Sequence, residues 1–276
     1  MKKTIIFLLV TVCSIQAFAQ QTDQFKDEKW IAQHKIKSVK EWFFIPEEGK
    51  MTPSEYVFIT NYVEYNNAGK IVVEDEYKEG QYLYTSKYTY NKMGDKLEVK
   101  RLAENDSFLS KDYYVYEYTS QNQVEKLIKN DSVIVKFKYD GKQSATKPVE
   151  ARVYNKIGTV IGKDVFHYNS NGLVDKTQKY MGTDKLFYTK EFTYNDSSRV
   201  TEEITYNPEK TVFIKKVYKY NAAGHLNIEL KYDADGNVLS RMIYTLDGQG
   251  KPVQGMYYNK EGKLTGILRY EYKYHQ

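Results

Sequence analysis

The sequence has few cysteines, prolines and tryptophans, and it has no long apolar run. Among its 276 residues there is one cysteine, Cys13, together with five prolines and two tryptophans. A single cysteine cannot build a disulfide framework. The longest apolar run, Ile5 to Val12, is well short of the ~20 residues that a membrane-spanning helix needs. These absences disfavour a disulfide-stapled fold and a helical membrane anchor.

The first twenty residues instead predict a secretory signal peptide. Lys2 and Lys3 precede the apolar run, and Ala17-Phe18-Ala19 is a small-x-small cleavage site. We expect residues 1–19 to be removed between Ala19 and Gln20, which takes Cys13 with them. Val10-Thr11-Val12 lacks the small residue that a lipobox places before its cysteine. The mature protein is therefore expected in the periplasm, at the cell surface or outside the cell.

The charge balance singles out no partner. Of 41 basic residues, Lys2 and Lys3 lie in the signal, which leaves 39 against 36 acidic residues. Both signs are interleaved along the chain, so no basic stripe for nucleic acid is visible.

Tyrosine is abundant, with 28 copies, and it marks a repeated turn. Tyr, Thr, Val and Ile favour strands, and Lys suits exposed strand faces. The signature Tyr-Asn/Asp-x-x-Gly starts at Tyr65, Tyr90, Tyr154, Tyr168, Tyr220, Tyr232 and Tyr258. Asn or Asp can accept a hydrogen bond from the backbone two residues on, and Gly supplies the positive φ that closes the turn. Each copy therefore predicts a β-hairpin.

The repeat predicts an all-β protein. Signature turns alternate with less regular links such as 77–80, 180–183 and 206–209, and the tyrosine spacing gives a two-strand unit of about two dozen residues. We expect an antiparallel meander of hairpins forming an open, twisted or curled sheet, with a short helix within 22–34 capped by Thr22 or Asp23. Residues 20–276 are predicted to form one domain, because the motif resumes directly after the loop at 142–148.

Within strands the apolar residues alternate. In the stretch after Gly224, Leu226, Ile228, Leu230 and Tyr232 are predicted to share one face, with the polar residues between them on the other. One face of the sheet should be buried and the other solvated.

The search for catalytic or metal-binding groups is largely negative. The four histidines, at 34, 167, 225 and 275, have no zinc-ligand spacing. The carboxylates of Glu74-Asp75-Glu76 and Glu202-Glu203 could form a glycosidase pair, but neighbouring strand residues point to opposite faces. Asp233 and Asp235 beside Gly236 have a faint calcium-loop pattern that turn chemistry already explains. No cofactor or metal is expected.

The tyrosines are the one candidate binding feature. We expect Tyr82, Tyr84, Tyr88 and Tyr90 to share a face of one strand, and Tyr114, Tyr116 and Tyr118 to share a face of the strand two positions later. Such rows can be the core of a sheet, because cross-strand aromatic pairs stabilise it. The alternative is a platform whose flat rings and hydroxyl rim suit sugar rings or an extended peptide.

The string Tyr-x-Tyr-Asn-x-x-Gly, complete at 88–94 and 218–224, resembles the YD (Rhs-type) repeat. Phe166, Val63 or Met256 replaces the first tyrosine in other copies. The resemblance implies side-by-side antiparallel hairpins in a surface or secreted protein of Bacteroidetes-like character, with carbohydrate binding in some members. Asn replaces Asp in most turns, the accompanying Arg is largely missing, and about ten hairpin strands are expected, which is too few for a closed shell.

We therefore expect a non-catalytic binding or structural module of the bacterial envelope, whose partner is a glycan or an envelope protein. The alternative is a hydrolase acting on envelope or host polysaccharide. An integral outer-membrane barrel is disfavoured because Lys and Glu alternate on the face that lipid would touch. Ligand identity and oligomeric state are left open by the sequence.

Overall fold

A computed structural model describes residues 27–46, 53–140 and 147–276. The predicted signal peptide, its cleavage site at Ala19 and Gln20, and the helix cap at Thr22 or Asp23 lie outside the described residues. Most of the predicted loop at 142–148 does so as well.

The described chain contains one short helix and eighteen strands. The helix, α2, spans Glu28–Gln33, and the side chain of Asp27 caps it by accepting from the Trp30 amide at 2.9 Å. The strands are β1 (Ile36–Pro46), β2 (Pro53–Tyr65), β3 (Ile71–Lys78), β4 (Gln81–Tyr90), β5 (Lys96–Leu102), β6 (Phe108–Tyr118), β7 (Val124–Lys129), β8 (Val133–Lys138), β9 (Glu150–Tyr154), β10 (Val160–Tyr168), β11 (Val174–Met181), β12 (Lys185–Tyr194), β13 (Val200–Tyr206), β14 (Val212–Tyr220), β15 (Leu226–Tyr232), β16 (Val238–Leu246), β17 (Pro252–Asn259) and β18 (Leu264–Tyr274).

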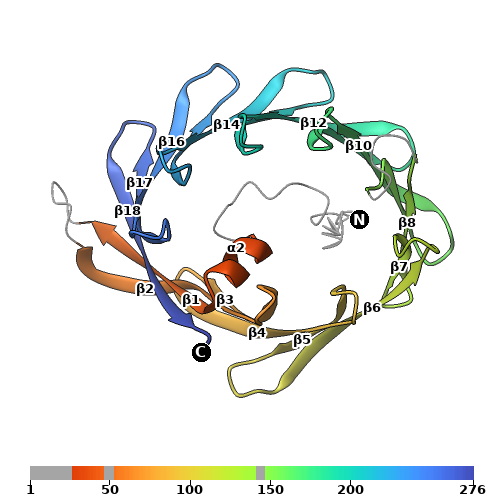
Figure 1. Ribbon diagram of the computed structural model, residues 1–276, viewed down its shortest axis with the longest axis horizontal. Coiled ribbons are helices and arrows are strands. Elements are labelled where there is room, and N and C mark those ends of the chain that lie inside the picture. Colours follow the sequence, from red (N-terminus) through yellow and green to blue (C-terminus); the bar gives the residue numbers. More distant parts are fainter. Residues whose placement is uncertain (1–26, 47–52, 141–146) are drawn as a thin grey trace, which may run out of the picture.

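The sheet is a closed barrel, so the prediction of an open sheet is wrong (Figure 1). Each strand pairs antiparallel with the next, and β18 pairs with β1 over Ile36–Phe44, which closes the ring. The number of strands expected from the sequence was too low, because short connections such as 130–132 and 182–184 join strands without a signature turn. The closing pair joins the two ends of the chain, and no local pattern announces it.

The lumen side of the wall is identified by α2, which lies within the ring (Figure 1). Ile31 of α2 is completely buried in a cluster with Ile36, Val39, Val63 and Tyr65. Since directly opposite residues share a face, Val39 and its partners Val63 and Tyr272 mark the lumen wall. The side chains at the alternate positions of each of these strands therefore face outward.

The connections fall on two rims of different shape. Turns at 66–70, 91–95, 119–123, 169–173, 195–199, 221–225 and 247–251 form one rim, and turns at 79–80, 103–107, 130–132, 155–159, 182–184, 207–211, 233–237 and 260–263 form the other. Figure 1 shows the first set curving into the opening and the second set projecting outward. We name them the inturned rim and the splayed rim.

The signature turn has the predicted chemistry. At 65–69, the Asn66 side chain accepts from the amides of Ala68 and Lys70 at 3.0 Å each, and Gly69 has φ +78°. Copies of the motif occur on both rims: Tyr65, Tyr90, Tyr168 and Tyr220 precede inturned turns, whereas Tyr154, Tyr232 and Tyr258 precede splayed ones. The same local code is therefore used at both ends of the barrel.

A β-bulge follows most of these turns and reverses the alternation of the next strand. Beside 221–225, Tyr220 pairs with Leu226, but Lys219 pairs with Ile228. Leu226 is consequently buried against Tyr218 and Tyr220 in the lumen, while Ile228 faces outward. The predicted shared face of Leu226 and Ile228 is wrong for this reason.

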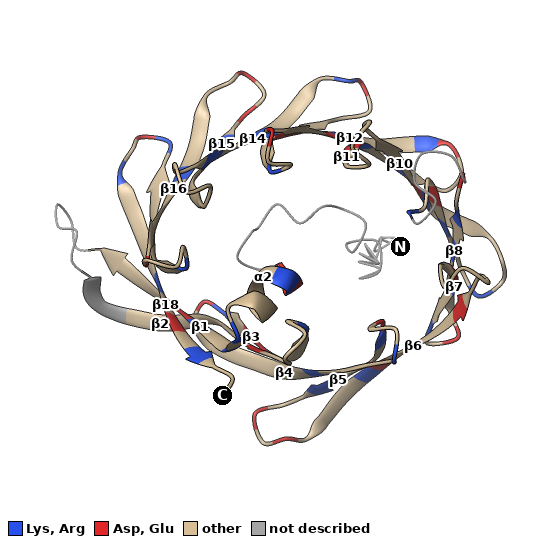
Figure 2. Cartoon of the chain, viewed as in Figure 1, with Lys and Arg blue, Asp and Glu red and all other residues tan. Residues whose placement is uncertain are grey.

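The hydrophobic clusters lie on the lumen side of the wall, whereas charged residues occur on both sides. The largest cluster lies on the lumen side and includes Val99, Leu127, Val135, Ala151 and Phe166. Basic and acidic residues are mixed around the whole ring (Figure 2). They form cross-strand ion pairs on the outer wall as well, as between Lys111 and Glu98 at 2.6 Å.

Candidate functional site: the tyrosine-lined lumen

Six of the seven predicted binding tyrosines face the lumen. Tyr88 lies opposite Val99, and Tyr116 lies opposite Leu127, both of which belong to the lumen cluster. The other four are Tyr84, Tyr90, Tyr114 and Tyr118. Tyr114 is only 7% exposed and is a core residue, whereas the other five are half-buried. The lumen wall thus combines buried and accessible rings.

Tyr82 does not share this face. Its register partner is Tyr77, while Tyr84 pairs with Glu76, so a bulge at Leu83 separates the two tyrosines. The Tyr82 hydroxyl lies 2.8 Å from the Thr85 hydroxyl on the outer wall. The prediction for Tyr82 is wrong because the bulge reverses the alternation at the start of β4.

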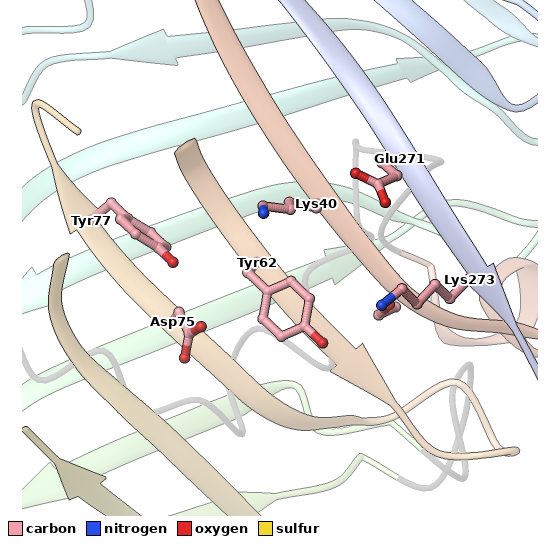
Figure 3. A pocket seen from close by; sticks show the side chains of 7 residues that line it. Lys40, Tyr62, Asp75, Tyr77, Glu271 and Lys273 are labelled. Carbon is pink, nitrogen blue, oxygen red and sulfur yellow. The ribbon is translucent and has the colours of Figure 1, made fainter. Parts of the chain in front are cut away.

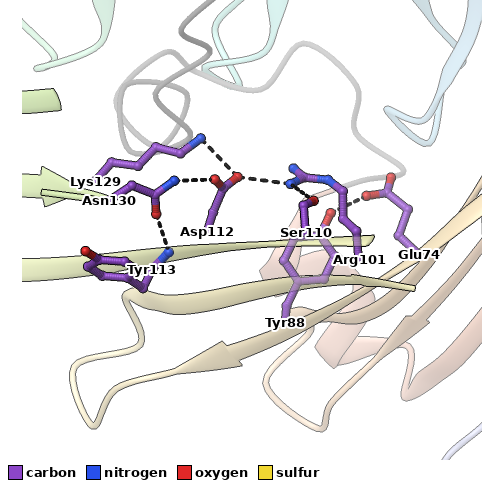
Figure 4. A network of polar contacts seen from close by, with 8 residues as sticks. All are labelled: Glu74, Tyr88, Arg101, Ser110, Asp112, Tyr113, Lys129 and Asn130. Atoms are coloured by element: carbon purple, nitrogen blue, oxygen red, sulfur yellow. Dashed lines mark hydrogen bonds and ion pairs between the residues drawn. The ribbon is translucent and has the colours of Figure 1, made fainter. Parts of the chain in front are cut away.

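A polar network lies on the lumen side of β3 to β7 (Figure 4). Asp112 receives the Arg101 guanidinium at 3.1 Å, the Lys129 ammonium at 3.0 Å and the Asn130 amide at 2.7 Å. On the neighbouring strands, the Tyr88 hydroxyl donates to Glu74 at 2.5 Å. The polar groups between the rings are therefore engaged with one another.

The network fixes the charge of its central carboxylate. Burial alone would raise the pKa of Asp112, but hydrogen bonds from Asn130, Lys129 and Arg101 outweigh burial and lower the pKa below its ordinary value. The Asp112 carboxylate is therefore ionised near neutral pH and accepts three hydrogen bonds. It is not suited to exchange a proton in that pH range.

The sequence did not reveal the role of the tyrosines at the inturned rim. Their hydroxyls donate to backbone carbonyls at the start of a neighbouring hairpin, at separations of about twenty residues along the chain. These bonds run from Tyr90 to Ile71, Tyr139 to Val124, Tyr168 to Pro148, Tyr194 to Val174, Tyr220 to Val200 and Tyr272 to Pro252. We call them tyrosine ties. In the sequence, these bonds correspond to a spacing of about twenty residues between a signature tyrosine and the residue that follows the preceding inturned turn.

Each tie extends the pairing between two hairpins beyond the end of the strand ladder. Between β13 and β14 the last ladder pair near this rim is Glu202 with Val217, and the tie from Tyr220 to Val200 follows at 2.7 Å. The tie satisfies a carbonyl that the ladder leaves unpaired. Burial raises the pKa of the Tyr220 hydroxyl, and the opposing charge of Arg199 is weaker. The hydroxyl is therefore a protonated donor.

Cations complete the lining of the inturned rim. Lys70, Lys147 and Arg199 each occupy the last position before a tied residue. Their charged groups lie 5.4, 5.8 and 5.7 Å from the ring centres of the corresponding tie tyrosines. The inturned rim is thus lined by tyrosine rings, and basic side chains lie over several of them.

The outer wall carries a shallow depression of about 260 Å³ where β18, β1, β2 and β3 meet (Figure 3). Its lining is Ser38, Lys40, Tyr62, Asp75, Tyr77, Glu271 and Lys273. Burial, followed by the hydrogen bond to Glu64, raises the pKa of Tyr62 to about 12. Charges of both signs line this open surface, and we assign it no ligand.

The candidate carboxylates do not converge. Glu202 pairs with Lys215 on the outer wall, whereas Glu203 faces the lumen, where it accepts from Lys190 at 2.6 Å. Asp233 accepts from the amides of Asp235 and Asn237 at 3.0 and 2.8 Å, as a turn residue does. Within the described ranges no cluster of three His, Cys, Asp or Glu side chains could hold a metal ion.

The sequence search also missed a buried lumen carboxyl. Asp164 on β10 is 8% exposed and pairs in register with Ala151 of the lumen cluster. Burial raises its pKa, and the nearby Lys179 only partly opposes that effect. No motif marked Asp164, because its burial depends on the closure of the barrel around it.

No helix in the described part of the chain has the length and apolarity needed to cross a bilayer.

A family model described only as "Uncharacterised protein" matches residues 142–275. No curated protein matches the chain. Neither comparison supplies an activity.

Three solved structures show a distant likeness. A porin-like protein from Bacteroides uniformis is 10% identical, with 86% of this chain and 98% of that chain covered and a TM-score of 0.45. A porin-like protein from Bacteroides vulgatus is 12% identical over the same shares, with a TM-score of 0.38. A TcdB2-TccC3-TEV structure is 12% identical over 77% of this chain and 13% of that chain, also with a TM-score of 0.38. Such values do not establish a common function.

The predicted membership of the YD-repeat family is wrong. The family model that matches residues 142–275 is that of an uncharacterised protein and not of YD-repeat proteins. Carbohydrate binding, which the resemblance implied for some members, loses that support together with the family.

Proposed function

We propose that the protein is a non-catalytic binding module of the bacterial cell envelope, and that the lumen tyrosines of β4 and β6 contact its ligand. The observation that carries the proposal is that Tyr84, Tyr88, Tyr116 and Tyr118 are half-buried on the lumen wall. Rings in this position keep part of their surface accessible while their neighbours hold them in place.

A polypeptide segment is the ligand class that the structure supports best. The chain's own α2 provides the example, because Trp30 and Ile31 pack against lumen residues that include Tyr65, Tyr270 and Tyr272. Aromatic side chains in a concave surface are common anchors for peptides. The same kind of lumen wall continues beyond the sector that α2 covers.

The hydrolase alternative has less support. A general acid and a base need carboxyl groups whose environments keep one of them protonated and bring both to one bond. Asp112 and Glu203 are each paired with cations, and Glu202 lies on the other side of the wall. Release of reducing ends from envelope polysaccharide by the purified protein would restore this alternative.

The predicted export of the chain supports the envelope assignment. The sequence predicts removal of residues 1–19, so mass mapping of protein from the envelope fraction should find Gln20 at the N-terminus. A retained segment 1–19 would contradict the predicted processing.

Binding can be tested with a labelled peptide that copies residues 27–35. These residues include α2, which packs against Tyr65, Tyr270 and Tyr272 in the lumen. We expect fluorescence anisotropy to report saturable binding to the mature protein, and Tyr116→Ala to weaken it by roughly tenfold. Tyr113→Ala is the matched control, because Tyr113 is the neighbouring tyrosine on the outer face of β6. Absence of binding, or an equal loss in both variants, would contradict the lumen as the site.

A further inference from the structure

The outer wall is not uniform around the barrel. From β5 to β7 it carries balanced ion pairs, including Lys111 with Glu98 and Lys126 with Glu117, both at 2.6 Å. From β15 to β2 an apolar row crosses six strands, because each member lies directly opposite the next. The row consists of Ile228, Ile243, Met256, Ile267, Phe44 and Val57. Ile267 is only 1% exposed, so the other five residues form the accessible part of the row.

This row faces outward. Lys40 and Phe44 lie on the side of β1 opposite to Val39, whose side chain packs against α2 in the lumen. Phe44 pairs with Ile267, and the register carries the same face through Met256 to Ile243 and beyond. Val57 at one end of the row is 43% exposed, and Phe213 near the splayed end of β14 is 65% exposed.

The charges on this arc have mainly one sign. The outward-facing basic residues of β14 to β18 are Lys215, Lys219, Arg241, Arg269 and Lys273, and the outward-facing acidic residue of the same described strands is Glu271. Lys215 is partly offset by its ion pair with Glu202 of β13. The arc is therefore apolar with a basic border.

Several of these cations lie over aromatic rings. The Arg241 guanidinium is 4.5 Å from the ring centre of Tyr258, and that of Arg269 is 4.9 Å from the ring centre of Phe44. Basic side chains with apolar stems beside tyrosine, tryptophan and aliphatic groups are typical of surfaces that lie in the headgroup region of a bilayer.

We propose that the outer wall of β14 to β18 and β1, which runs from the top of the ring down its left side in Figure 1, docks on an anionic lipid surface. The basic border attracts anionic headgroups, and the apolar row enters the boundary between headgroups and acyl chains. A second copy of the chain is a poorer occupant, because a twofold contact would bring Lys219, Arg241 and Arg269 against their own like charges. The balanced charges of β5 to β7 keep the opposite wall in water.

Vesicle co-sedimentation of the mature protein tests this docking. We expect binding to phosphatidylcholine vesicles that contain phosphatidylglycerol, little binding to pure phosphatidylcholine, and loss of binding at high salt. Lys219→Glu and Phe213→Ser should each weaken binding by roughly tenfold. Both residues are exposed, so their replacement leaves the lumen clusters intact.

Lys100→Glu and Val115→Ser are the matched controls, since both residues are exposed on the outer wall of β5 and β6. They should bind vesicles as the wild type does. No vesicle binding by the wild type, or equal losses in both pairs, would overturn the proposal. So would a dimer in sedimentation equilibrium that Phe213→Ser abolishes, because the face would then belong to a second copy. Peptide binding in the lumen is measured separately and does not depend on this outcome.

Discussion

The two rims of the barrel use the same turn but place its tyrosine on opposite sides of the wall. At the inturned rim Tyr220 pairs with Leu226 on the lumen face, and at the splayed rim Tyr232 pairs with Val238 on the outer face. Successive turns present opposite faces because the strands alternate in direction. In each case the hairpin bends toward its tyrosine, which explains why one rim curves inward and the other outward (Figure 1).

The consequence is that the two rims differ in cohesion. At the inturned rim the side chain of Arg199 lies where a Cβ on Gly224 of the next turn would be, although the space beside Gly172 on the same rim is open. Around Gly236 at the splayed rim no atom lies within 4 Å of such a Cβ. All tyrosine ties found among the described residues are at the inturned rim. Tyrosine ties thus link neighbouring hairpins at the inturned rim, whereas the cross-hairpin contacts at the splayed rim are of other kinds, such as the hydrogen bond from Asn130 to Asp112.

The largest expected difference comes from the turn glycines. Gly69 and Gly236 have nearly equal φ angles, +78° and +83°, so valine should strain both turns by roughly 1–3 kcal/mol. A Cβ at Gly69 would also overlap the Glu28 carbonyl of α2. Displacing α2 exposes Ile31, which adds about 2 kcal/mol or more to the loss.

Urea unfolding followed by tryptophan fluorescence would measure this difference. Gly69→Val should lower the free energy of unfolding clearly more than Gly236→Val does. Equal losses would mean that the contact with α2 contributes nothing and that backbone strain is the whole effect.

A smaller difference is expected from the tyrosine hydroxyls. Tyr220→Phe removes the donor to the Val200 carbonyl and should cost about 1–2 kcal/mol, because a partly buried acceptor loses its partner. Tyr232→Phe at the splayed rim should cost only a few tenths of a kcal/mol. Chemical denaturation of the two variants under identical conditions tests this difference. If loss of any tyrosine hydroxyl had the same effect, the two free energies of unfolding would be equal.

Alkaline pH should weaken the inturned rim. Burial raises the pKa of Tyr168, Tyr194 and Tyr272 in the folded protein above the ordinary value of 10.0, and that of Tyr139 to about 12. The folded state thus retains protons that the unfolded chain releases. The stabilisation is complete below pH about 10 and is lost as the pH rises through the folded pKa values.

Thermal melts between pH 9 and 12, together with ultraviolet titration of the tyrosinate band, would follow this loss. We expect the melting temperature to fall from about pH 10 upward, with a shallower fall in Tyr220→Phe, which has one buried tie hydroxyl fewer. A melting temperature that stays constant to pH 12 would contradict the protonated ties.

The smallest effect is expected inside the loop of a turn. Ala222 is exposed between Asn221 and Gly224, so Ala222→Ser should change the free energy of unfolding by less than about 0.5 kcal/mol. Gly224→Val in the same turn should cost roughly 1–3 kcal/mol. Indistinguishable unfolding curves for these two variants would show that the positive φ of Gly224 is not needed.

The local structure was predictable because it is written in short motifs. Asn66 and Gly69 specify a turn through hydrogen bonding and a positive φ, and the strands before and after it follow from alternating residues. The alternating stretch after Gly224 forms a strand, β15 (Leu226–Tyr232). The helix expected within 22–34 appears as α2 at Glu28–Gln33.

The global arrangement was not predictable in the same way. Closure depends on pairing β1 with β18, whose residues Val39 and Tyr272 lie at opposite ends of the sequence. The faces were misassigned wherever a bulge intervenes, as at Tyr82 and Ile228, because an extra residue leaves no mark in the alternation. The roles of Tyr90 and Tyr118 at the rim also depend on which neighbouring hairpin each one meets.

The central claim is that the ties make the inturned rim the cohesive end of the barrel, and amide hydrogen exchange of β13 and β14 tests it most directly. The two ends of these strands lie on different rims, so each strand contains its own control. We predict slower exchange at the inturned ends, near Val200 and Tyr220, than at the splayed ends, near Tyr206 and Val212, and loss of that difference in Tyr220→Phe. Equal exchange at both ends of the wild-type strands, or a difference that survives the removal of the hydroxyl, would contradict the account.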